Sequence, residues 1–556
     1  MSDTTLYRLG DHTSVEPLVN RFAAWANVVS PLSFSLYLQH YQLEVLRSYL
    51  KDPEVHFSAC KNPKLRSGPL VDIPVERAGE VAAFLATTEL DLDENLKFAR
   101  SLIEFHDYLV AEAKGLTMEP FYYRLPPELR GYVELVYDYY HRPHVRFFEG
   151  LLYDSPYYRK DLQSFRLFRQ QRDDARPFFM STPRLAADDE IEWHIPFDSP
   201  LVDELFKLEH TPQPLGYIRE LLGLTTDDDR RLLPLLTTGE IAPRRWDGPL
   251  RVRYYGHACV LIEWNGVSIL TDPCLGVTPL DGGIERFTYQ DLPERIDYIL
   301  ITHGHHDHFC LESLLRLRNR TGCIVVPHAS GVFYGDVSLK IMCERLGFKV
   351  VELDALESIQ LPGGEITGIP FLGEHVDLPH SKSAYVVRSG EEQMLFAADS
   401  DCLDPHLYEN VRRATGPIQS VFVGMECVGA PLSWSCGPFL PERPEHSIEQ
   451  SRRSKGCDSE RAQLMLRAVE AQRLYVYAMG REPWLEYLLG LALTEKSKQV
   501  TEARRLLRVA EQQGFAEAHL LFGRDEIYFT PLSTIAAPLS FVNQDHLIVE
   551  DQFSFS

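Results

Sequence analysis

The first 245 residues carry apolar positions at helical spacing. Leu36, Leu43, Leu46 and Leu50 lie seven, three and four residues apart, and apolar side chains repeat in a similar way between residues 129 and 140. Such intervals place side chains on one face of a helix. Aromatic residues are dense between residues 121 and 158, where they either pack a core or form a surface for a second copy or a protein substrate. We therefore expect residues 1–245 to form a mainly helical, aromatic-rich N-terminal domain.

From residue 246 the pattern changes to short apolar runs separated by turn residues, which is typical of strands. Runs at residues 252–263 and 267–271 flank Asn265-Gly266, a pair that tolerates the positive φ angles of a tight hairpin turn. A second hairpin is expected at residues 384–398. Between the hairpins, helix-like and strand-like segments alternate at residues 311–318, 323–327, 340–346 and 349–353. The pattern predicts an α/β domain over residues 246–556.

The central motif is Thr302-His303-Gly304-His305-His306-Asp307-His308, which follows the apolar residues 299–301. A short buried strand that ends in a histidine-rich loop explains this order. His303 and His305 are two residues apart and can face one metal ion, while Asp307 and His308 can turn to a second. Imidazole and carboxylate together suit zinc or iron. We therefore expect a dinuclear metal site at the end of this strand.

Candidate ligands also follow two later strands. Gly373-Glu374-His375 comes after an apolar stretch, and either Glu374 or His375 could point inward. Asp399 and Asp401 follow the second hairpin, and either could bridge two metals. With Glu374 the set holds three imidazoles and three carboxylates. Anionic donors of this kind favour a site that cycles between Fe(II) and Fe(III) over a dizinc hydrolase.

Composition narrows the class of protein. The 556 residues suffice for two or three domains, and 44% hydrophobic with 24% charged residues is ordinary for a globular protein. A net charge of −24 argues against a nucleic-acid partner, which needs basic grooves. The start of the chain lacks a signal peptide, no apolar run is long enough for a membrane helix, and the 10 cysteines form no Cys-x-x-Cys pair. We expect a cytoplasmic protein with no membrane partner.

The pattern His-x-His-x-Asp-His at a strand end resembles the metallo-β-lactamase superfamily, which implies an αββα sandwich. By this resemblance Asp272 either supports a metal-binding histidine or is a plain turn residue. His257 lies within the first predicted strand and is expected to pack near the site rather than to bind metal. No histidine follows the last predicted core strand, residues 473–477, where hydrolases of the superfamily supply one more ligand. The second metal is therefore expected to have a more open face.

A narrower resemblance rests on residues 250–485. The sequence Tyr-Gly-His-Ala at residues 255–258, the motif at 303–308, Phe-Leu-Gly-Glu-His at 371–375, Ala-Asp-Ser at 398–400 and Tyr-Ala-Met-Gly at 477–480 resemble the diiron β-hydroxylases of chloramphenicol-type biosynthesis. These metallo-β-lactamase-fold monooxygenases hydroxylate the β-carbon of an amino acid held as a thioester on a carrier (thiolation) domain of a nonribosomal peptide synthetase. One oxygen atom of O₂ enters the hydroxyl group and the other leaves as water.

The resemblance implies a cofactor, partners and a ligand set. The cofactor is a pair of iron ions in an oxo- and carboxylate-bridged cluster, with O₂ as cosubstrate and an external electron donor. The ligands would be His303, His305, Asp307, His308, Glu374 and Asp399, of which Glu374 and Asp399 are the expected catalytic residues. The N-terminal domain would serve dimerisation, giving a homodimer, and carrier docking.

Two other functions remain open: a hydrolase, and a binding protein whose metal domain no longer turns over and whose N-terminal half carries the function. A dizinc or dimanganese hydrolase of the lactonase or phosphodiesterase type would use His375 as the ligand and a metal-bound hydroxide as the nucleophile. The basic residues Arg443, Arg452, Arg453 and Lys455 either belong to a solvated loop or cover the site and meet the carrier domain or the phosphate of its arm.

Overall fold

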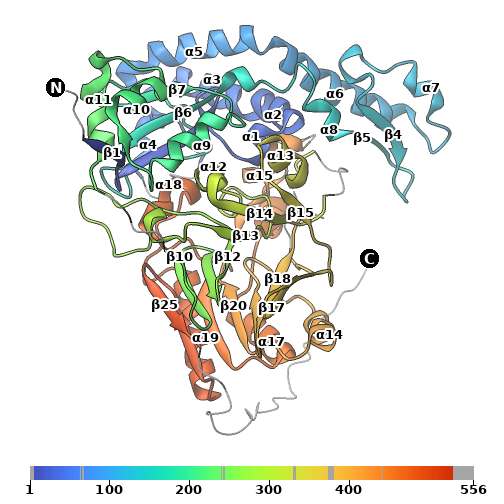
Figure 1. The fold of residues 1–556 in the computed structure, drawn as a ribbon. Helices are drawn as coiled ribbons and strands as arrows, with labels where there is room; N and C mark the ends of the chain where they lie inside the picture. Colours follow the sequence, from blue (N-terminus) through green and yellow to red (C-terminus); the bar gives the residue numbers. More distant parts are fainter. Residues whose placement is uncertain are drawn as a thin grey trace.

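The computed structural model describes residues 5–62, 64–65, 68–239, 241, 244–329, 334–373, 381–440 and 442–529. An N-terminal region lies across the top of a sandwich of two sheets (Figure 1). No helix in the described ranges is both long enough and apolar enough to cross a membrane.

The N-terminal region mixes helices and strands, so the expectation of a mainly helical domain is wrong. One four-stranded sheet has the order β3-β2-β6-β7, and a small sheet has the order β8-β1-β9. The strands are β1 (Leu6–Leu9), β2 (Thr13–Val19), β3 (Phe22–Ala23), β4 (Val133–Tyr137), β5 (Pro143–Phe147), β6 (Gln163–Arg169), β7 (Ile191–His194), β8 (Gln213–Pro214) and β9 (Leu236–Thr237).

Helices surround these sheets. They are α1 (Ala26–Val29), α2 (Pro31–Tyr37), α3 (Leu43–Lys51), α4 (Pro53–Cys60), α5 (Ala78–Asp91), α6 (Asp93–Glu112), α7 (Glu119–Tyr122), α8 (Glu149–Leu152), α9 (Pro200–Lys207), α10 (Leu215–Leu222) and α11 (Asp229–Leu232). Leu36 lies on α2, and Leu43, Leu46 and Leu50 lie on α3, so these four leucines are helical as predicted, although a π-helical turn, Leu38–Gln42, joins the two helices. Such a turn shifts the side chains that follow it to a new face.

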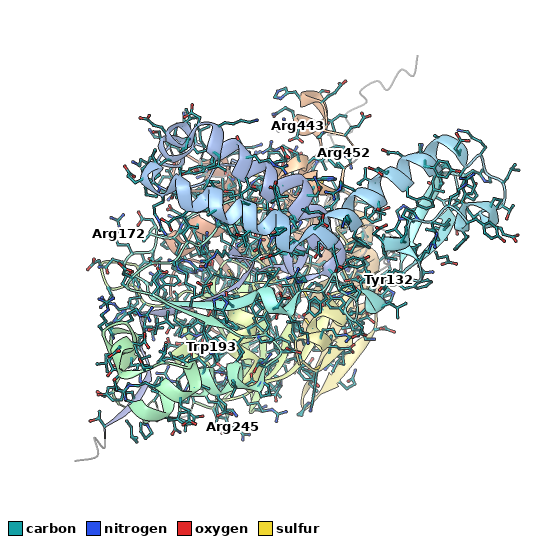
Figure 2. All side chains as sticks on the ribbon, turned by 90° about the horizontal axis from the view of Figure 1, so that it is seen from above. Tyr132, Arg172, Trp193, Arg245, Arg443 and Arg452 are labelled. Atoms are coloured by element: carbon teal, nitrogen blue, oxygen red, sulfur yellow. The ribbon has the colours of Figure 1, made fainter. Side chains whose placement is uncertain are left out.

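Residues 129–140 explain the error about helical content. Val133 and Leu135 are buried and alternate with the half-buried Glu134 and Val136, which is the two-residue period of a strand. β4 and β5 form a hairpin that projects with α7 from one end of the molecule (Figure 1). Tyr132 lies at the base of this projection in the view from above (Figure 2). In the sequence, four apolar positions at helical intervals favoured a helix, although the same segment also has the two-residue alternation of a strand.

The C-terminal part is a sandwich of two seven-stranded sheets. The first has the order β15-β14-β13-β12-β11-β10-β25 and the second β16-β17-β18-β19-β20-β23-β24. The strands are β10 (Arg251–Gly256), β11 (Cys259–Trp264), β12 (Val267–Thr271), β13 (Ile296–Leu300), β14 (Thr321–Val326), β15 (Val350–Glu352), β16 (Ser358–Leu361), β17 (Gly364–Ile369), β18 (Ala384–Ser389), β19 (Glu392–Phe396), β20 (Ser420–Gly424), β23 (Arg473–Tyr477), β24 (Glu517–Leu520) and β25 (Asp525–Tyr528). A separate short pair joins β21 (Ala430–Pro431) to β22 (Arg453–Ser454).

Each face of the two sheets is covered. Side chains such as Leu300 and Phe422 fill the space between the sheets. α14 (Pro405–Thr415), α17 (Ser459–Val469) and α19 (Lys498–Gln512) cover the outer face of the second sheet. α12 (Leu311–Leu317) and α13 (Leu339–Arg345) cover the first, and there one apolar cluster joins Ile299 and Leu314 to Trp25 of the N-terminal region. The remaining helices are α15 (Leu432–Ser435), α16 (His446–Ser451) and α18 (Glu486–Leu489).

The first hairpin differs from its prediction in one important place. Residues 252–263 form two strands, β10 and β11, rather than one, and His257 lies in the tight turn between them. Gly256 has a φ of 114° and His257 a φ of 50°, so the chain reverses over these two residues. The Asn265-Gly266 turn between β11 and β12 has the expected positive φ angles, 45° and 82°.

Candidate metal centre

Donor side chains converge where strands of both sheets end. β13 leads into the loop of His303 to His308, β12 into Asp272, and β19 into Asp399. His257, Asp272 and Ala398, which precedes Asp399, have positive φ angles of 50°, 32° and 46°. These angles are unfavourable for residues other than glycine and persist only where the surrounding structure imposes them. The strained positions therefore surround the donor cluster.

One group of donors comprises His303, His308 and Asp399, all buried. Oδ2 of Asp399 lies 3.7 Å from Nε2 of His303 and 3.2 Å from Nε2 of His308. His305 joins them, because its Nδ1 is 3.1 Å from Nε2 of His303. Oδ2 of Asp399 thus faces both histidines, as an oxygen shared by two metal ions would.

A second group comprises His257, Asp307 and His308. Nε2 of His257 lies 3.1 Å from Oδ2 of Asp307 and 3.2 Å from Nε2 of His308. Ligand atoms bound about 2.1 Å from one metal ion stand at similar distances from one another. The separations in the second group therefore fit one bound metal ion.

Asp272 fixes the orientation of His308. Nδ1 of His308 is 2.9 Å from Oδ2 of Asp272, and since a carboxylate only accepts, Nδ1 carries the proton and donates. The backbone N–H and the hydroxyl of Thr302 donate to the same carboxylate at 2.7 and 2.6 Å. The unprotonated Nε2 of His308 then faces the donor groups, so Asp272 orients a candidate ligand histidine in addition to ending a turn.

Charges in the cluster are strongly coupled. Burial would lower the pKa of His308, but Asp399, Asp307 and Asp272 hold it well above its usual range. Burial would raise the pKa of Asp307, but His308 and His257 hold it well below its usual range. Without cations, concentrated carboxylates draw protons onto nearby imidazoles. A bound metal ion would replace those protons.

The other candidates are placed differently. Asp401 accepts from the backbone of Cys402 and forms a 2.5 Å ion pair with Arg461, so it belongs to neither donor group. His306 hydrogen-bonds the Leu488 carbonyl at 2.9 Å and packs on aromatic rings. Glu374 and His375 lie outside the described residues.

Comparisons with known proteins identify the family. A family model described as "Diiron non-heme beta-hydroxylase N-terminal domain" matches residues 8–239, and a "Beta-lactamase superfamily domain" matches residues 251–404. The 4-amino-L-phenylalanyl-[CmlP-peptidyl-carrier-protein] 3-hydroxylase of Streptomyces venezuelae is 35% identical over 523 residues, which are 91% of this chain and 97% of that protein. This chain belongs to the diiron β-hydroxylase family.

Structural comparison gives the same family. The crystal structure of CmlA, a diiron β-hydroxylase from Streptomyces venezuelae, matches with a TM-score of 0.87 at 32% identity, covering 94% of this chain and 100% of that one. A metal-dependent hydrolase of Exiguobacterium is 31% identical over 119 residues, 21% of this chain and 46% of that protein. That match covers about a fifth of this chain and lacks the N-terminal region.

The cofactor of a diiron β-hydroxylase suits these donors, since imidazole and carboxylate both bind iron. When bound, the iron pair reacts with O₂ and supplies the oxidant for hydroxylation. The chain's own part is to hold the iron, to keep water away and to position the carbon that reacts.

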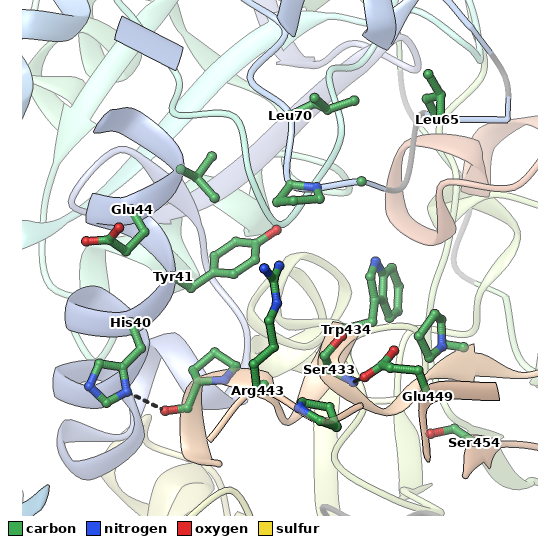
Figure 3. Close-up of a pocket in the computed structure, with 18 of the residues that line it drawn as sticks. His40, Tyr41, Glu44, Leu65, Leu70, Ser433, Trp434, Arg443, Glu449 and Ser454 are labelled. Atoms are coloured by element: carbon green, nitrogen blue, oxygen red, sulfur yellow. Dashed lines mark hydrogen bonds between the residues drawn. The ribbon is translucent and has the colours of Figure 1, made fainter. Parts of the chain in front are cut away.

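A cavity of about 1720 Å³ reaches these donors. It runs between the π-helical turn and α3 on one side and residues 428–454 on the other (Figure 3). His305, Asp307 and Asp399 line it, as do apolar side chains such as Trp434 and Leu489. A site of this kind, mostly apolar with a few convergent polar groups, is typical of a substrate pocket.

Two residues in this hydroxylase site were missed from the sequence. His257 was expected to pack near the site, but its position in the turn brings Nε2 into the second donor group. Glu426 lines the cavity with Asp307 and Asp399, and burial, with repulsion from both, raises the pKa of its carboxyl to about 8. An acidic residue soon after a core strand, as at Asp272 and Asp399, was the signal available for Glu426.

Proposed function

We propose that this β-hydroxylase inserts one oxygen atom at the β-carbon of an amino acid tethered to a carrier domain of a nonribosomal peptide synthetase. The observation that carries the proposal is the large cavity that reaches the donor groups, in a chain similar over nearly its whole length to a hydroxylase whose name specifies a carrier-bound substrate. A tethered amino acid needs a passage long enough for its arm. An external electron donor would supply the two electrons that the second oxygen atom requires.

Cations along the cavity support a carrier-bound substrate. Lys51, Lys64 and Arg443 line it, and none of them has an acidic partner within the described ranges. Arg443 extends into the cavity beside Tyr41 (Figure 3). A phosphate group on the carrier's arm is the anion that such residues would bind. Arg453, in contrast, donates to the carbonyls of Val428 and Gly429 and has a structural role.

The ligand set we propose has His303, His305 and Glu374 on one iron, His257, Asp307 and His308 on the other, and Asp399 between them. The open face expected on the second iron is then smaller than the sequence indicated, because His257 occupies part of it. His257→Ala should lose one iron ion of the pair, measured by iron analysis. Full occupancy in that variant would return His257 to a packing role.

Glu374 distinguishes the hydroxylase from a hydrolase. Glu374→His should still bind metal but activate O₂ slowly, because it removes a negative charge that stabilises the oxidised pair. His375→Ala should be the milder change. If His375→Ala empties the site while Glu374→Ala leaves it full, the histidine is the ligand and the hydrolase alternative becomes the better one.

The direct test is single turnover. Iron-loaded protein, reductant and O₂ are mixed with a carrier domain loaded with candidate amino acids, and the mass of the product is measured by mass spectrometry. We expect a gain of one oxygen atom on the loaded carrier and none on the free amino acid. Cleavage of the thioester without oxygen insertion would overturn the proposal in favour of a hydrolase.

We also propose a homodimer that uses the projection formed by α7, β4 and β5. Its aromatic side chains Tyr123, Tyr139 and Tyr140 are 79%, 101% and 81% exposed, while Phe147 at the end of β5 is buried. The segment thus supplies both a core and an apolar surface, and such surfaces favour interfaces. Tyr139→Ser with Tyr140→Ser should yield a monomer in analytical ultracentrifugation. A dimer that persists in this variant would exclude the projection as the interface.

A further inference from the structure

Glu426 lies beside Asp399 because three backbone segments pack together there. The N–H of Gly424, at the end of β20, donates to the carbonyl of Ala398 at 2.9 Å. The N–H of Gly456 donates to the carbonyl of Glu426 at 3.1 Å, and a side chain on Gly456 would lie 3.0 Å from the Asp399 carbonyl. The backbone of Glu426 is therefore fixed by hydrogen bonds and close packing with neighbouring segments.

The carboxylate of Glu426 faces the cavity without a cation. Asp399, Asp307 and His308 are the charged groups that act on it, and two of these are acids. In the described part of the chain, no lysine, arginine or hydrogen-bond donor contacts its side chain. Glu426 is half-buried in the cavity wall, and an ionised carboxylate held beside two others there is unfavourable unless a positive group meets it. The site is therefore complete only when a cation is present.

Iron is one candidate for this cation, but the geometry favours another. Glu426 belongs to neither group of converging donors, whereas His257, Asp307, His308, His303 and Asp399 do. Its side chain instead lines the cavity through which a substrate would reach the cluster. The remaining cation is the α-ammonium group of the substrate, which an amino acid keeps when its carboxyl group forms a thioester.

We propose that Glu426 binds the α-ammonium group of the carrier-bound amino acid and thereby positions its β-carbon at the iron pair. This inference rests on the proposed function. The α-carbon joins the ammonium group to the β-carbon, so an anion beside the cluster that holds the ammonium fixes the β-carbon close to the oxidant. Trp434, Leu489 and Leu491, which line the same cavity, offer apolar surface for the rest of the side chain.

The proposal predicts a selectivity that bears on the order of reactions. An amino acid that has been joined to a peptide carries a neutral amide in place of the ammonium group. It would leave the Glu426 carboxylate unpaired, so a peptidyl thioester should be a poor substrate. Hydroxylation should therefore precede the reaction that forms a peptide bond at this nitrogen.

Binding measurements test the proposal without turnover. The probes are phenylalanyl-pantetheine as a stable amide, its 3-phenylpropanoyl counterpart, which lacks the amino group, and its N-acetyl form. Affinity is measured for iron-loaded protein without O₂ or reductant. The wild type should prefer the ammonium compound by about 10- to 100-fold, the usual effect of one charged hydrogen bond. Glu426→Gln should lose this preference and retain its iron, and Glu426→Asp should keep part of it.

Glu442→Gln is the matched control, because Glu442 lines the same cavity but is exposed. It should keep the full preference. If Glu426→Gln keeps the preference, Glu426 does not bind the ammonium group; if it loses iron, Glu426 is a metal ligand. Either result overturns the inference while leaving the hydroxylase intact. Failure of the wild type to hydroxylate any loaded carrier would instead overturn the proposed function, which single turnover measures separately.

Discussion

Replacing Asp272 with asparagine tests the hydrogen bond that orients His308. Asp272 is fully buried, and an asparagine keeps one oxygen for the N–H of Thr302 but turns an NH₂ group toward His308. Nδ1 of His308 can then only accept, so its proton moves to Nε2. Nε2 lies 3.2 Å from both Nε2 of His257 and Oδ2 of Asp399. Protonation at this atom removes a shared donor from both groups.

Loss of such a partner lowers metal affinity about 10- to 100-fold, which corresponds to about 1.4–2.8 kcal/mol. The assay is competition for Fe(II) between the apoprotein and a coloured chelator under anaerobic conditions. Asp401→Asn is the control, because Asp401 is also buried but pairs with Arg461. Iron binding by Asp272→Asn as tight as that of the wild type, with Asp401→Asn also unchanged, would refute the role assigned to Asp272.

Three further outcomes are expected. Asp399→Ala should lose most bound iron, since its Oδ2 faces both His303 and His308. Asp401→Ala should keep its iron and only lower the melting temperature, because Asp401 pairs with Arg461. If iron analysis shows the opposite, Asp401 is the carboxylate that bridges the two irons. Arg443→Glu should weaken binding of the loaded carrier at low salt more than Arg452→Glu does, because Arg452 is exposed but lies outside the cavity. Equal effects of the two variants in binding titrations would exclude a specific contact between Arg443 and the phosphate. Burial raises the pKa of Glu149 to about 7 from 4.5, so stability should fall by up to about 3 kcal/mol as pH rises through that window. The melting temperature of Glu149→Gln should therefore exceed that of the wild type above pH 7 but not below pH 4.5. A difference in melting temperature that does not change with pH would contradict this.

The parts of the fold that the sequence predicts best are those set by local chemistry. Asn265-Gly266 forms its turn because both residues accept positive φ, and residues 311–317 form a helix where apolar positions repeat at helical intervals. The motif from His303 to His308 lies at the end of a buried strand as expected. In each case the deciding interactions are a few residues apart in the chain.

The errors have a common physical cause. His257 sits in an apolar run that reads as one strand, and only contacts with distant residues hold it at a φ of 50° in a turn; Ala478, for example, donates to its carbonyl. Glu426 reaches the site because Gly424 pairs with Ala398, a contact across the sheet that no local pattern encodes. Four apolar residues near 133 fitted both a helix and a strand, and pairing with β5 decided between them.

The apolar cluster that joins Trp25 to Ile299 and Leu314 limits how this enzyme can evolve by domain exchange. A gene fragment encoding the sandwich alone would expose those apolar side chains of the cluster that pack against the N-terminal region, and each large side chain exposed there would lose about 1.5–3 kcal/mol of stabilisation. A fragment encoding the N-terminal region alone would lose one wall of the cavity. Recombination that exchanges either half for that of a distant relative must therefore match the buried surface as well as the chemistry. New substrates should arise by point substitutions along the cavity rather than by exchange of whole domains.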